Sequence, residues 1–290
     1  MRVAIVGGGW AGLAAAVEAQ AQGHAVTVFE AARHWGGRAR SLPLPWPDQL
    51  PNPEGRPQLT LDNGQHILIG AYTETLALME RVGLRPAEHL CATPLNLRFA
   101  DGSGLAVPPW ARRWPAPLDV LAATALAQGW GGRDKLGFLH HSLRWQRQGF
   151  ACDPDTTVHA LCQGLSVRVR ADLIDPLCVA ALNTPMADAS AAVFLRVLRD
   201  ALLGPGWGPW RASDLLLPRS DLGQLFPEAA VPWLAARGAV LRTGQRVTAL
   251  HRGPSGWRVL LDGAAHAADR VVLACPAPEA ARLVDTAELA

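Results

Sequence analysis

The chain of 290 residues lacks the features that mark several protein classes. It has five cysteines, at Cys91, Cys152, Cys162, Cys178 and Cys275. This odd number without a Cys-x-x-Cys pair predicts neither a disulfide framework nor a zinc site, and it favours a reducing compartment. No stretch approaches 18 uninterrupted apolar residues, so we expect no membrane-spanning helix and a cytoplasmic protein. The formal net charge is only +2, which gives no reason to expect a nucleic-acid partner.

The most informative stretch is the N-terminal one, which predicts a strand, a glycine turn and a helix. An apolar run at residues 3–6 is typical of a strand that is covered on both faces. In the Gly-x-Gly-x-x-Gly pattern that follows, Gly7 permits a tight turn and Gly9 lets the backbone approach a pyrophosphate. Gly12 lets the helix expected at residues 11–22 lie close to the strand. The N-terminus of that helix would direct free N–H groups at phosphate oxygens.

A second strand, expected at residues 25–29, leads to Glu30, about 18 residues after Gly12. This spacing is close to that of the acidic residue that holds the ribose hydroxyls of a bound dinucleotide. The alternative is a glycine-rich turn without a ligand. Because the strand, the helix and the acidic residue are all in place, the sequence favours dinucleotide binding.

A second glycine pair follows at once, as Gly36-Gly37-Arg38. A guanidinium can meet phosphate oxygens in a bidentate manner, so Arg38 is a candidate for pairing with the pyrophosphate. The alternative is an ordinary surface arginine. The neighbouring glycines favour the first interpretation, since they allow a backbone to approach a ligand.

The rest of the chain suggests a nucleotide domain that is interrupted by a helical insertion. Residues 42–57 are rich in proline and predict an irregular excursion, and Asn63-Gly64 predicts a turn between two short strands. Residues 95–107 have the character of a hairpin, whereas helical patterns dominate the following hundred residues. Strand patterns return after residue 239. We therefore expect a first part of the nucleotide domain at 1–84, a mainly helical substrate domain at 85–214 and a returning part at 215–290.

The combined glycine motifs resemble the FAD-binding signature of the flavin amine oxidase and phytoene desaturase superfamily. The block 247–274 is similar to that superfamily's returning β-segment, in which the backbone at the position of Val247 meets the adenine. The resemblance implies an α/β fold with a Rossmann-like FAD-binding domain, and FAD as the cofactor. The positions that match its cofactor contacts are Gly7, Gly9, Gly12, Glu30, Gly36, Gly37, Arg38, Gly64, Gln65 and Val247.

Three inner stretches narrow the match, at residues 61–72, 175–185 and 217–227. Together they resemble the hydroxysqualene dehydroxylase family of bacterial hopanoid synthesis. This resemblance implies the reductive dehydroxylation of hydroxysqualene to squalene, with an isoprenoid small molecule as the substrate. The alternatives are a carotenoid or phytoene desaturase, a flavin amine oxidase, or a truncated flavoprotein without activity. The family continues beyond the last apolar strand, so we expect the C-terminal part of its fold to be missing.

The resemblance also implies roles near the flavin ring. Gly64 and Gln65 match positions beside the isoalloxazine, although turn chemistry alone accounts for Asn63-Gly64. His66 is the candidate catalytic acid for a leaving hydroxyl, because the unperturbed pKa of histidine is near neutral. A structural histidine is the alternative. One departure from the family is Ala32, where many amine oxidases carry an arginine, with Arg33 adjacent.

Tryptophans alternate with arginines in the segment 108–150. The tryptophans of this segment are Trp110, Trp114, Trp130 and Trp145. Tryptophan prefers membrane interfaces, and Arg112-Arg113 would suit anionic head groups, so peripheral association with the inner face of the cytoplasmic membrane is one interpretation. The other is that these tryptophans form the core of the helical domain. The sequence leaves both open, together with the oligomeric state.

Overall fold

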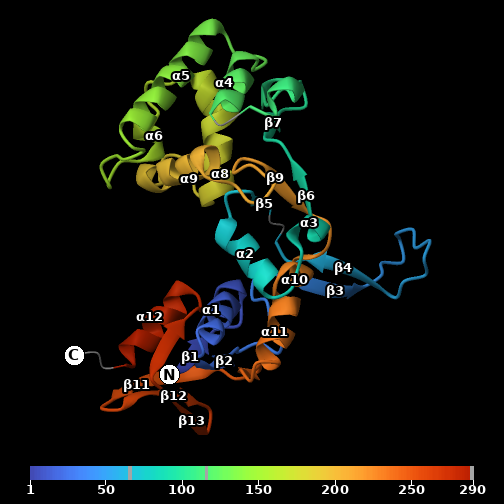
Figure 1. Ribbon diagram of the computed structural model, residues 1–290, viewed down its shortest axis with the longest axis vertical. Coiled ribbons are helices and arrows are strands. Elements are labelled where there is room, and N and C mark those ends of the chain that lie inside the picture. Colours follow the sequence, from blue (N-terminus) through green and yellow to red (C-terminus); the bar gives the residue numbers. More distant parts are fainter. Residues whose placement is uncertain (65–66, 115–116, 288–290) are drawn as a thin grey trace. The chain divides into compact units, whose positions relative to one another are not determined.

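The computed structural model describes residues 1–64, 67–114 and 117–287. The chain divides into two compact units (Figure 1). The first unit contains Met1–Ile67, Glu74–Cys91 and Pro218–Ala290, and the second contains Leu68–Thr73 and Ala92–Leu217. The domain boundaries predicted after residues 84 and 214 differ from the limits of these units and stay predictions. Both ends of the chain contribute to the first unit, which therefore depends on contacts between segments far apart in sequence.

The first unit is built on a parallel four-stranded sheet in the order β10-β2-β1-β14. Its strands are β1 (Arg2–Val6), β2 (Ala25–Phe29), β10 (Val240–Arg242) and β14 (Arg270–Leu273). In the register, Ile5 lies opposite Val28 of β2 and Val272 of β14. β1 is central and its last four residues are buried, which agrees with the apolar run expected for a strand covered on both faces.

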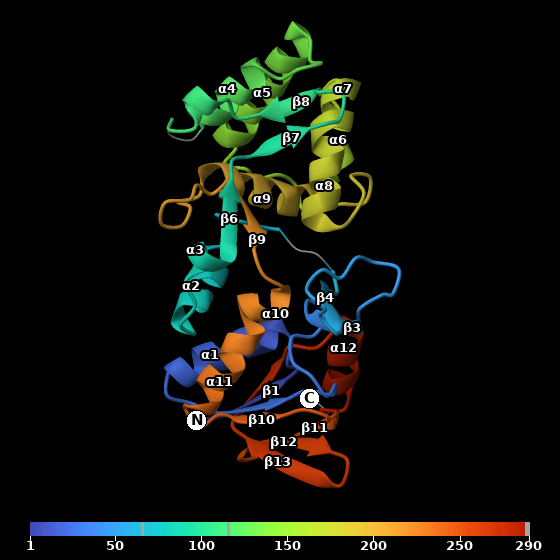
Figure 2. The same ribbon diagram turned by 90° about the vertical axis from the view of Figure 1, so that its right-hand side faces the viewer.

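Successive residues of β1 supply two different cores, because side chains alternate across a strand. Val3 and Ile5 pack with α1 (Trp10–Ala21) and α11 (Pro227–Ala235), which cover one face of the sheet (Figure 2). Ala4 and Val6 belong to the core of the other face. There they pack with α12 (Ala277–Asp285) and with an antiparallel sheet formed by β11 (Val247–Gly253), β12 (Gly256–Leu261) and β13 (Ala264–Ala268).

Smaller elements complete the first unit. They are β3 (Ser41–Pro45), β4 (Gln58–Asp62), α2 (Thr73–Arg81), α3 (Pro86–His89) and α10 (Leu222–Leu225). The proline-rich segment is not irregular throughout, because β3 pairs with β4 and places Pro43 opposite Thr60. A two-stranded sheet has only edge strands, which tolerate residues that lack a backbone N–H. The expectation of an irregular excursion over 42–57 is therefore wrong for its first residues.

The turn at Asn63-Gly64 does not join two strands of one hairpin. Gly64 has the positive φ of +91° that its turn requires. However, β4 before the turn pairs with β3, whereas β5 (Leu68–Ile69) after it pairs with β9 (Leu215–Pro218). The local turn chemistry was predicted correctly, but it did not determine which strand would be the partner.

The second unit is mainly helical. Its helices are the 3-10 helix η1 (Pro109–Ala111), α4 (Leu118–Ala125), α5 (Gly132–Arg147), α6 (Val158–Leu161), α7 (Val167–Val169), the π-helix η2 (Arg170–Ile174), α8 (Asp175–Leu182) and α9 (Ala191–Leu203). The expected hairpin is present as β7 (Asn96–Arg98) and β8 (Gly104–Ala106). A short sheet has the order β5-β9-β6, and the chain crosses between the units within β9 and β6 (Leu90–Thr93). Within the described ranges, no helix has the length and apolar character needed to cross a membrane.

Candidate cofactor site

The two glycine turns of the first unit lie against each other. The backbone N–H of Gly36 donates to the carbonyl oxygen of Gly8 over 2.9 Å, and Gly9 and Gly36 form a parallel β-bridge. The first turn leads into α1 from the end of β1. The N-terminus of α1 and the second glycine turn therefore share one surface.

The glycines of the first turn serve different purposes. Gly7 has a φ of +112°, and a Cβ atom there would lie 2.5 Å from the carbonyl oxygen of Ala274. A Cβ atom at Gly12 would lie 1.8 Å from the carbonyl oxygen of Gly7, so both positions require glycine for packing. At Gly9 the nearest atom to an added Cβ is the Cα of Gly37, at 3.6 Å. Because packing does not demand glycine at Gly9, its open backbone fits the close approach of a ligand.

The start of α1 suits an anion. Its N-cap residue, Gly9, has no side chain to satisfy the free N–H groups, and the first turn holds no acidic residue. The helix dipole places partial positive charge at this end. Arg38 is exposed nearby on the second turn, and its guanidinium has no hydrogen-bond or ion-pair partner among the residues that the structure describes. This donor set fits the pyrophosphate of FAD, although Arg38 and the glycines stay predictions as cofactor ligands.

Glu30 follows β2 directly and points its carboxylate at the first turn. One carboxylate oxygen accepts from the N–H of Gly8 at 2.6 Å, and the other accepts from the N–H of Ala32 at 2.7 Å. An ionised carboxylate offers about four acceptor positions, so each oxygen keeps capacity for a ribose hydroxyl. The arrangement holds the carboxylate in a fixed orientation and is compatible with the predicted ribose contact.

The backbone around Glu30 also brings in the C-terminal part of the chain. The carbonyl oxygen of Glu30 accepts from the N–H of Gln245 at 2.9 Å, and that of Ala32 accepts from Gly244 at 2.7 Å. Val247 opens β11 two residues later and packs with Phe29 in one core. The structure thus brings Glu30 and Val247 together from opposite ends of the sequence, whereas their contacts with a nucleotide stay predictions.

A cavity of about 610 Å³ borders the second glycine turn. It is lined by His34, Trp35, Arg40, Ser41, Leu42, Pro43, Gly223, Pro227, Glu228 and Val231. This volume is typical of pockets for small molecules and cofactors. Arg40, which contacts His34, gives the cavity a basic group, and Glu228 gives it an acidic one. Burial, and then the nearby charge of Asp221, raise the pKa of the Glu228 carboxyl.

A polar network fixes the loop beside this cavity. The hydroxyl of Ser41 contacts the carboxylate of Asp221 and accepts from the N–H of Gly223 at 2.9 Å. Asp221 also caps α10 by accepting from the N–H of Gln224 at 3.2 Å. The Oδ1 of Asp62 accepts from the N–H of Leu222, the first residue of α10, at 2.8 Å. The network therefore joins the start of β3 to the first turn of α10, two segments that form adjacent walls of the cavity.

Two of the predicted residues, Gln65 and His66, lie outside the described residues, so their proposed roles stay predictions. Gly64 is described, and no heavy atom lies within 4 Å of the position that its Cβ would take. Within the part of the chain that the structure describes, no group of three or more metal-ligating side chains is found.

Sequence reasoning missed the two tryptophans that brace the glycine turns. The indole N–H of Trp10 donates to the carbonyl oxygen of Ala39 at 2.8 Å and so ties the start of α1 to the second turn. The ring of Trp35 lies against Gly8, where an added Cβ would come within 2.4 Å of it. The only sequence signal was their position, inside the first motif and directly before the second.

Several curated proteins are similar to this chain. A hydroxysqualene dehydroxylase of Zymomonas mobilis is 28% identical over 94% of the chain, and one of Rhodopseudomonas palustris is 30% identical over 97% of it. The chain spans 61% and 63% of the lengths of these two relatives. A zeta-carotene desaturase of Synechocystis is 41% identical, but over only 31% of the chain.

The fold is also similar to solved structures. An oxidoreductase from Methanosarcina mazei matches 98% of the chain with a TM-score of 0.62 and 17% identity. A protein from Pyrococcus furiosus matches 98% with a TM-score of 0.63 and 18% identity. In each case the chain covers 61% of the other structure. At such identities the likeness concerns the fold alone, and it confirms the predicted fold class.

The family described as flavin containing amine oxidoreductase matches residues 10–289, which is nearly the whole chain. This match confirms the predicted flavin cofactor, FAD. The chain belongs to the flavin containing amine oxidoreductase family.

Proposed function

We propose that this protein is an FAD-dependent oxidoreductase that reduces hydroxysqualene to squalene in hopanoid or related isoprenoid synthesis. The observation that carries this proposal is the extent of the matches to hydroxysqualene dehydroxylases. They cover 94% and 97% of the chain and so include both units, whereas the desaturase match covers 31%. Substrate choice depends on residues outside the nucleotide motif, which makes the longer match the more informative one.

The chain's own residues have distinct tasks in this proposal. The N-terminus of α1 and Arg38 hold the pyrophosphate, Glu30 holds the ribose, and the backbone at Val247 meets the adenine. The family resemblance assigns Gly64 and Gln65 to the flavin ring. FAD, once bound and reduced, would be the source of the hydride. The protein's contribution is therefore to orient the cofactor and to exclude water from the reacting carbon.

The reaction also needs a proton. The allylic C–O bond breaks, and the hydroxyl leaves as water after it has taken up one proton, while a hydride replaces it at carbon. His66 is the proposed donor. Glu228 is a second candidate from the structure, because it lines the cavity and burial raises the pKa of its carboxyl.

The test uses the purified full chain loaded with FAD and reduced in the absence of oxygen. With hydroxysqualene as substrate, we expect squalene, detected by gas chromatography and mass spectrometry. The His66→Ala and Glu228→Gln variants identify the proton donor, because only loss of the donor should lower turnover sharply while the flavin spectrum is kept. A protein that retains flavin, forms no squalene when its flavin is reduced, and dehydrogenates a carotene when its flavin is oxidised would be a desaturase. A protein that takes up no flavin would be a non-catalytic relative.

The proposal includes peripheral association with an anionic membrane at the inner face of the cytoplasmic membrane. The four tryptophans of the segment 108–150 divide into two pairs. Trp130 and Trp145 are buried in the core of the second unit. Trp110 and Trp114 are 57% and 43% exposed and lie edge to face with their ring centroids 4.9 Å apart. The exposed arginines between them, Arg112 and Arg113, supply the charge that attracts anionic head groups.

A vesicle flotation assay tests this association. We expect the protein to float with phosphatidylcholine vesicles that contain phosphatidylglycerol, and to remain behind when phosphatidylglycerol is left out. A Trp110→Ala/Trp114→Ala double variant should lose flotation. The matched control is Leu136→Ala on α5, which removes an exposed apolar side chain elsewhere on the second unit. If the native protein stays in the soluble fraction with both kinds of vesicle, the membrane proposal is wrong.

A further inference from the structure

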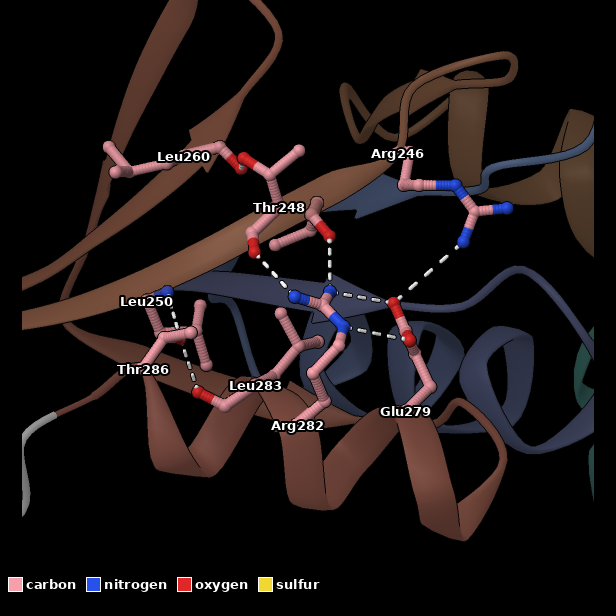
Figure 3. Close-up of polar contacts among 9 residues, drawn as sticks. Arg246, Thr248, Leu250, Leu260, Glu279, Arg282, Leu283 and Thr286 are labelled. Atoms are coloured by element: carbon pink, nitrogen blue, oxygen red, sulfur yellow. Dashed lines mark hydrogen bonds and ion pairs between the residues drawn. The ribbon is translucent and has the colours of Figure 1, made fainter.

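The start of β11 is tied to α12 by the side chain of Arg282 (Figure 3). One terminal nitrogen of the guanidinium donates to the carbonyl oxygen of Thr248 at 2.8 Å. The other donates to the carbonyl oxygen of Val247 at 3.4 Å. Two consecutive backbone carbonyls thus accept hydrogen bonds from one side chain that comes from a different element.

These carbonyls need such a partner because β11 contains a bulge. Val247 lies opposite Leu261 of β12 and Ala249 lies opposite Leu260, so Thr248 has no residue opposite it. The hydroxyl of Thr248 donates to the carbonyl oxygen of Leu260 at 3.2 Å. A bulge interrupts the regular ladder and re-aims the backbone around it. The guanidinium of Arg282 therefore sets the direction of backbone groups that the ladder leaves partly free.

Arg282 is itself held in place by Glu279, one helical turn earlier. Its Nε donates to one oxygen of that carboxylate at 3.0 Å, and its Nη2 donates to the other at 2.8 Å. Such a bidentate pair has a defined geometry. A second anchor lies one turn later, where the hydroxyl of Thr286 accepts from the backbone N–H of Leu250 at 3.0 Å. Leu283 lies between these anchors and is fully buried.

The same helix adjoins the first glycine turn. α12 follows β14 with Pro276 as its N-cap residue, and Ala274, directly after β14, contacts the turn. The carbonyl oxygen of Ala274 lies where a side chain at Gly7 would be, and its Cβ lies 3.3 Å from the position of a Cβ at Gly12. α12 therefore links the turn for the pyrophosphate directly to the start of β11.

The segment before β11 is hydrogen-bonded to Glu30, the proposed ligand of the ribose. Because Gln245 donates to the backbone carbonyl of Glu30, Val247 lies two residues beyond the point where the two segments meet. A base attached to a ribose that Glu30 holds is thus brought to the beginning of β11. At that place the chain offers a backbone N–H and C=O, which can read the donor and acceptor pattern of adenine if their direction is fixed.

We propose that Arg282, held by Glu279, is a positioning residue for adenine recognition, because it fixes the backbone of Val247 and Thr248 in the bulge of β11. This inference rests on the proposed binding of FAD. It concerns which base the site prefers, and it assigns no direct contact between Arg282 and the nucleotide. It predicts that the preference for adenine depends on a side chain more than thirty residues away in sequence.

The test measures how ADP and inosine diphosphate compete with FAD for the deflavinated full chain. Inosine diphosphate keeps the ribose and pyrophosphate but replaces the amino group of adenine by an oxygen. We expect the native chain to prefer ADP. The Arg282→Met variant should bind ADP about 10-fold more weakly, a loss of about 1.4 kcal/mol, with little change for inosine diphosphate. The preference between the two probes should therefore largely disappear.

The matched control is Arg246→Met. Arg246 also faces Glu279, at 3.8 Å, but no hydrogen bond joins it to the carbonyls of the bulge among the described residues. Its removal should leave the preference for ADP within about 2-fold of the native value. Arg282→Lys keeps a donor for one carbonyl and should restore part of the preference. Should Arg282→Met fail to fold, Glu279→Gln removes the anchor of the guanidinium and should reduce the preference in the same direction.

Three outcomes would overturn the positioning role. These are equal losses for both probes in Arg282→Met, an unchanged preference in the folded variant, and a native chain that binds both probes equally well. Equal losses would mean that the hydrogen bonds of Arg282 only stabilise the first unit, and a lower melting temperature would accompany them. A native chain that binds neither FAD nor ADP would instead contradict the underlying proposal of FAD binding. The two failures are thus distinguishable.

Discussion

Gly36 donates its backbone N–H to the carbonyl oxygen of Gly8 over 2.9 Å, and this bond joins the two glycine turns of the chain. The contact is close enough that an added Cβ at Gly37 would lie 3.0 Å from the Cα of Gly9. A larger residue in either turn would therefore alter the surface that the two turns share. The paired motifs act as one structural unit, which explains why they occur together.

Substitutions of two glycines of the first turn should affect FAD binding and the stability of the protein separately. Gly9→Ala is expected to leave the melting temperature of the flavin-free protein nearly unchanged, because the new Cβ would meet no atom closer than 3.6 Å. It should weaken FAD binding by about 10-fold or more, because this glycine of the motif lets the backbone approach the pyrophosphate. Gly12→Ala is the contrasting variant. Its Cβ would collide with the carbonyl oxygen of Gly7, so we expect a loss of about 2–3 kcal/mol in unfolding free energy.

Flavin fluorescence titration and thermal unfolding of both variants check this pair of outcomes. An apo protein that is strongly destabilised by Gly9→Ala would show that glycine is required there for packing.

Removal of the Arg38 guanidinium should weaken FAD binding without changing the stability of the apo protein. Arg38→Met is expected to raise the Kd for FAD by roughly 10- to 100-fold, because a hydrogen bond to a charged group contributes about 1.5–3 kcal/mol. The melting temperature of the apo protein should not change, since Arg38 is exposed. Arg33→Met is the matched control, because Arg33 is also exposed and lies before the second turn. Equal FAD affinities of the native protein and Arg38→Met would remove Arg38 from the site.

Glu228 should make stability depend on pH in a defined direction. Burial raises the pKa of its carboxyl above the ordinary value of 4.5, with Asp221 as the second cause, so the folded state binds the proton more tightly than the unfolded state. Ionisation therefore costs stability, and this cost appears as the pH rises from 4.5 through the raised pKa. Glu228→Gln avoids it and should melt at a slightly higher temperature than the native protein at pH 7–8.

At pH 4 and below, the carboxyl is protonated in both states, so native protein and Glu228→Gln should melt alike. Melting curves of both proteins from pH 4 to pH 8 test this pH dependence. A variant that is less stable than the native protein at pH 8 would mean that the Glu228 carboxylate is stabilised by the fold.

The thiol of Cys162 should be inert in the folded protein. It is fully buried, and burial raises its pKa to about 12, with smaller effects from Arg170 and Cys178. At pH 8 the reactive thiolate would thus be present in roughly one molecule in ten thousand. Iodoacetamide followed by peptide mass spectrometry should leave Cys162 unmodified in the native protein and label it in guanidinium chloride. Native labelling of Cys162 as fast as that of the half-buried Cys91 would contradict the burial.

Local sequence patterns predicted much of the first unit correctly. β1, α1 and β2 form where the apolar runs and the glycine turn placed them, because these signals act over a few neighbouring residues. The hairpin of β7 and β8 was found for the same reason. Pairing over a longer range was not predicted from local signals. The turn at Asn63-Gly64 was recognised, yet β4 pairs with β3 and not with the strand that follows the turn.

Local sequence patterns also failed to predict the environments of individual side chains. Residues 108–150 gave no indication that Trp145 would be buried and Trp110 exposed, because the difference depends on how the helices pack. Asp221 caps α10, and Arg219 donates to the carbonyl oxygen of Leu90 at 3.4 Å. Such choices depend on which groups folding brings within hydrogen-bond distance.

The sequence by itself determined the strand, turn and helix of the predicted dinucleotide site, because the spacing of Gly7, Gly9 and Gly12 is a local requirement of the turn and the helix. Only the tertiary structure decided how that site is completed. β14 lies beside β1, and Arg282 holds the start of β11, although hundreds of residues separate these segments from the first turn. Strand pairing and burial depend on the whole chain, so no short stretch of sequence could specify them.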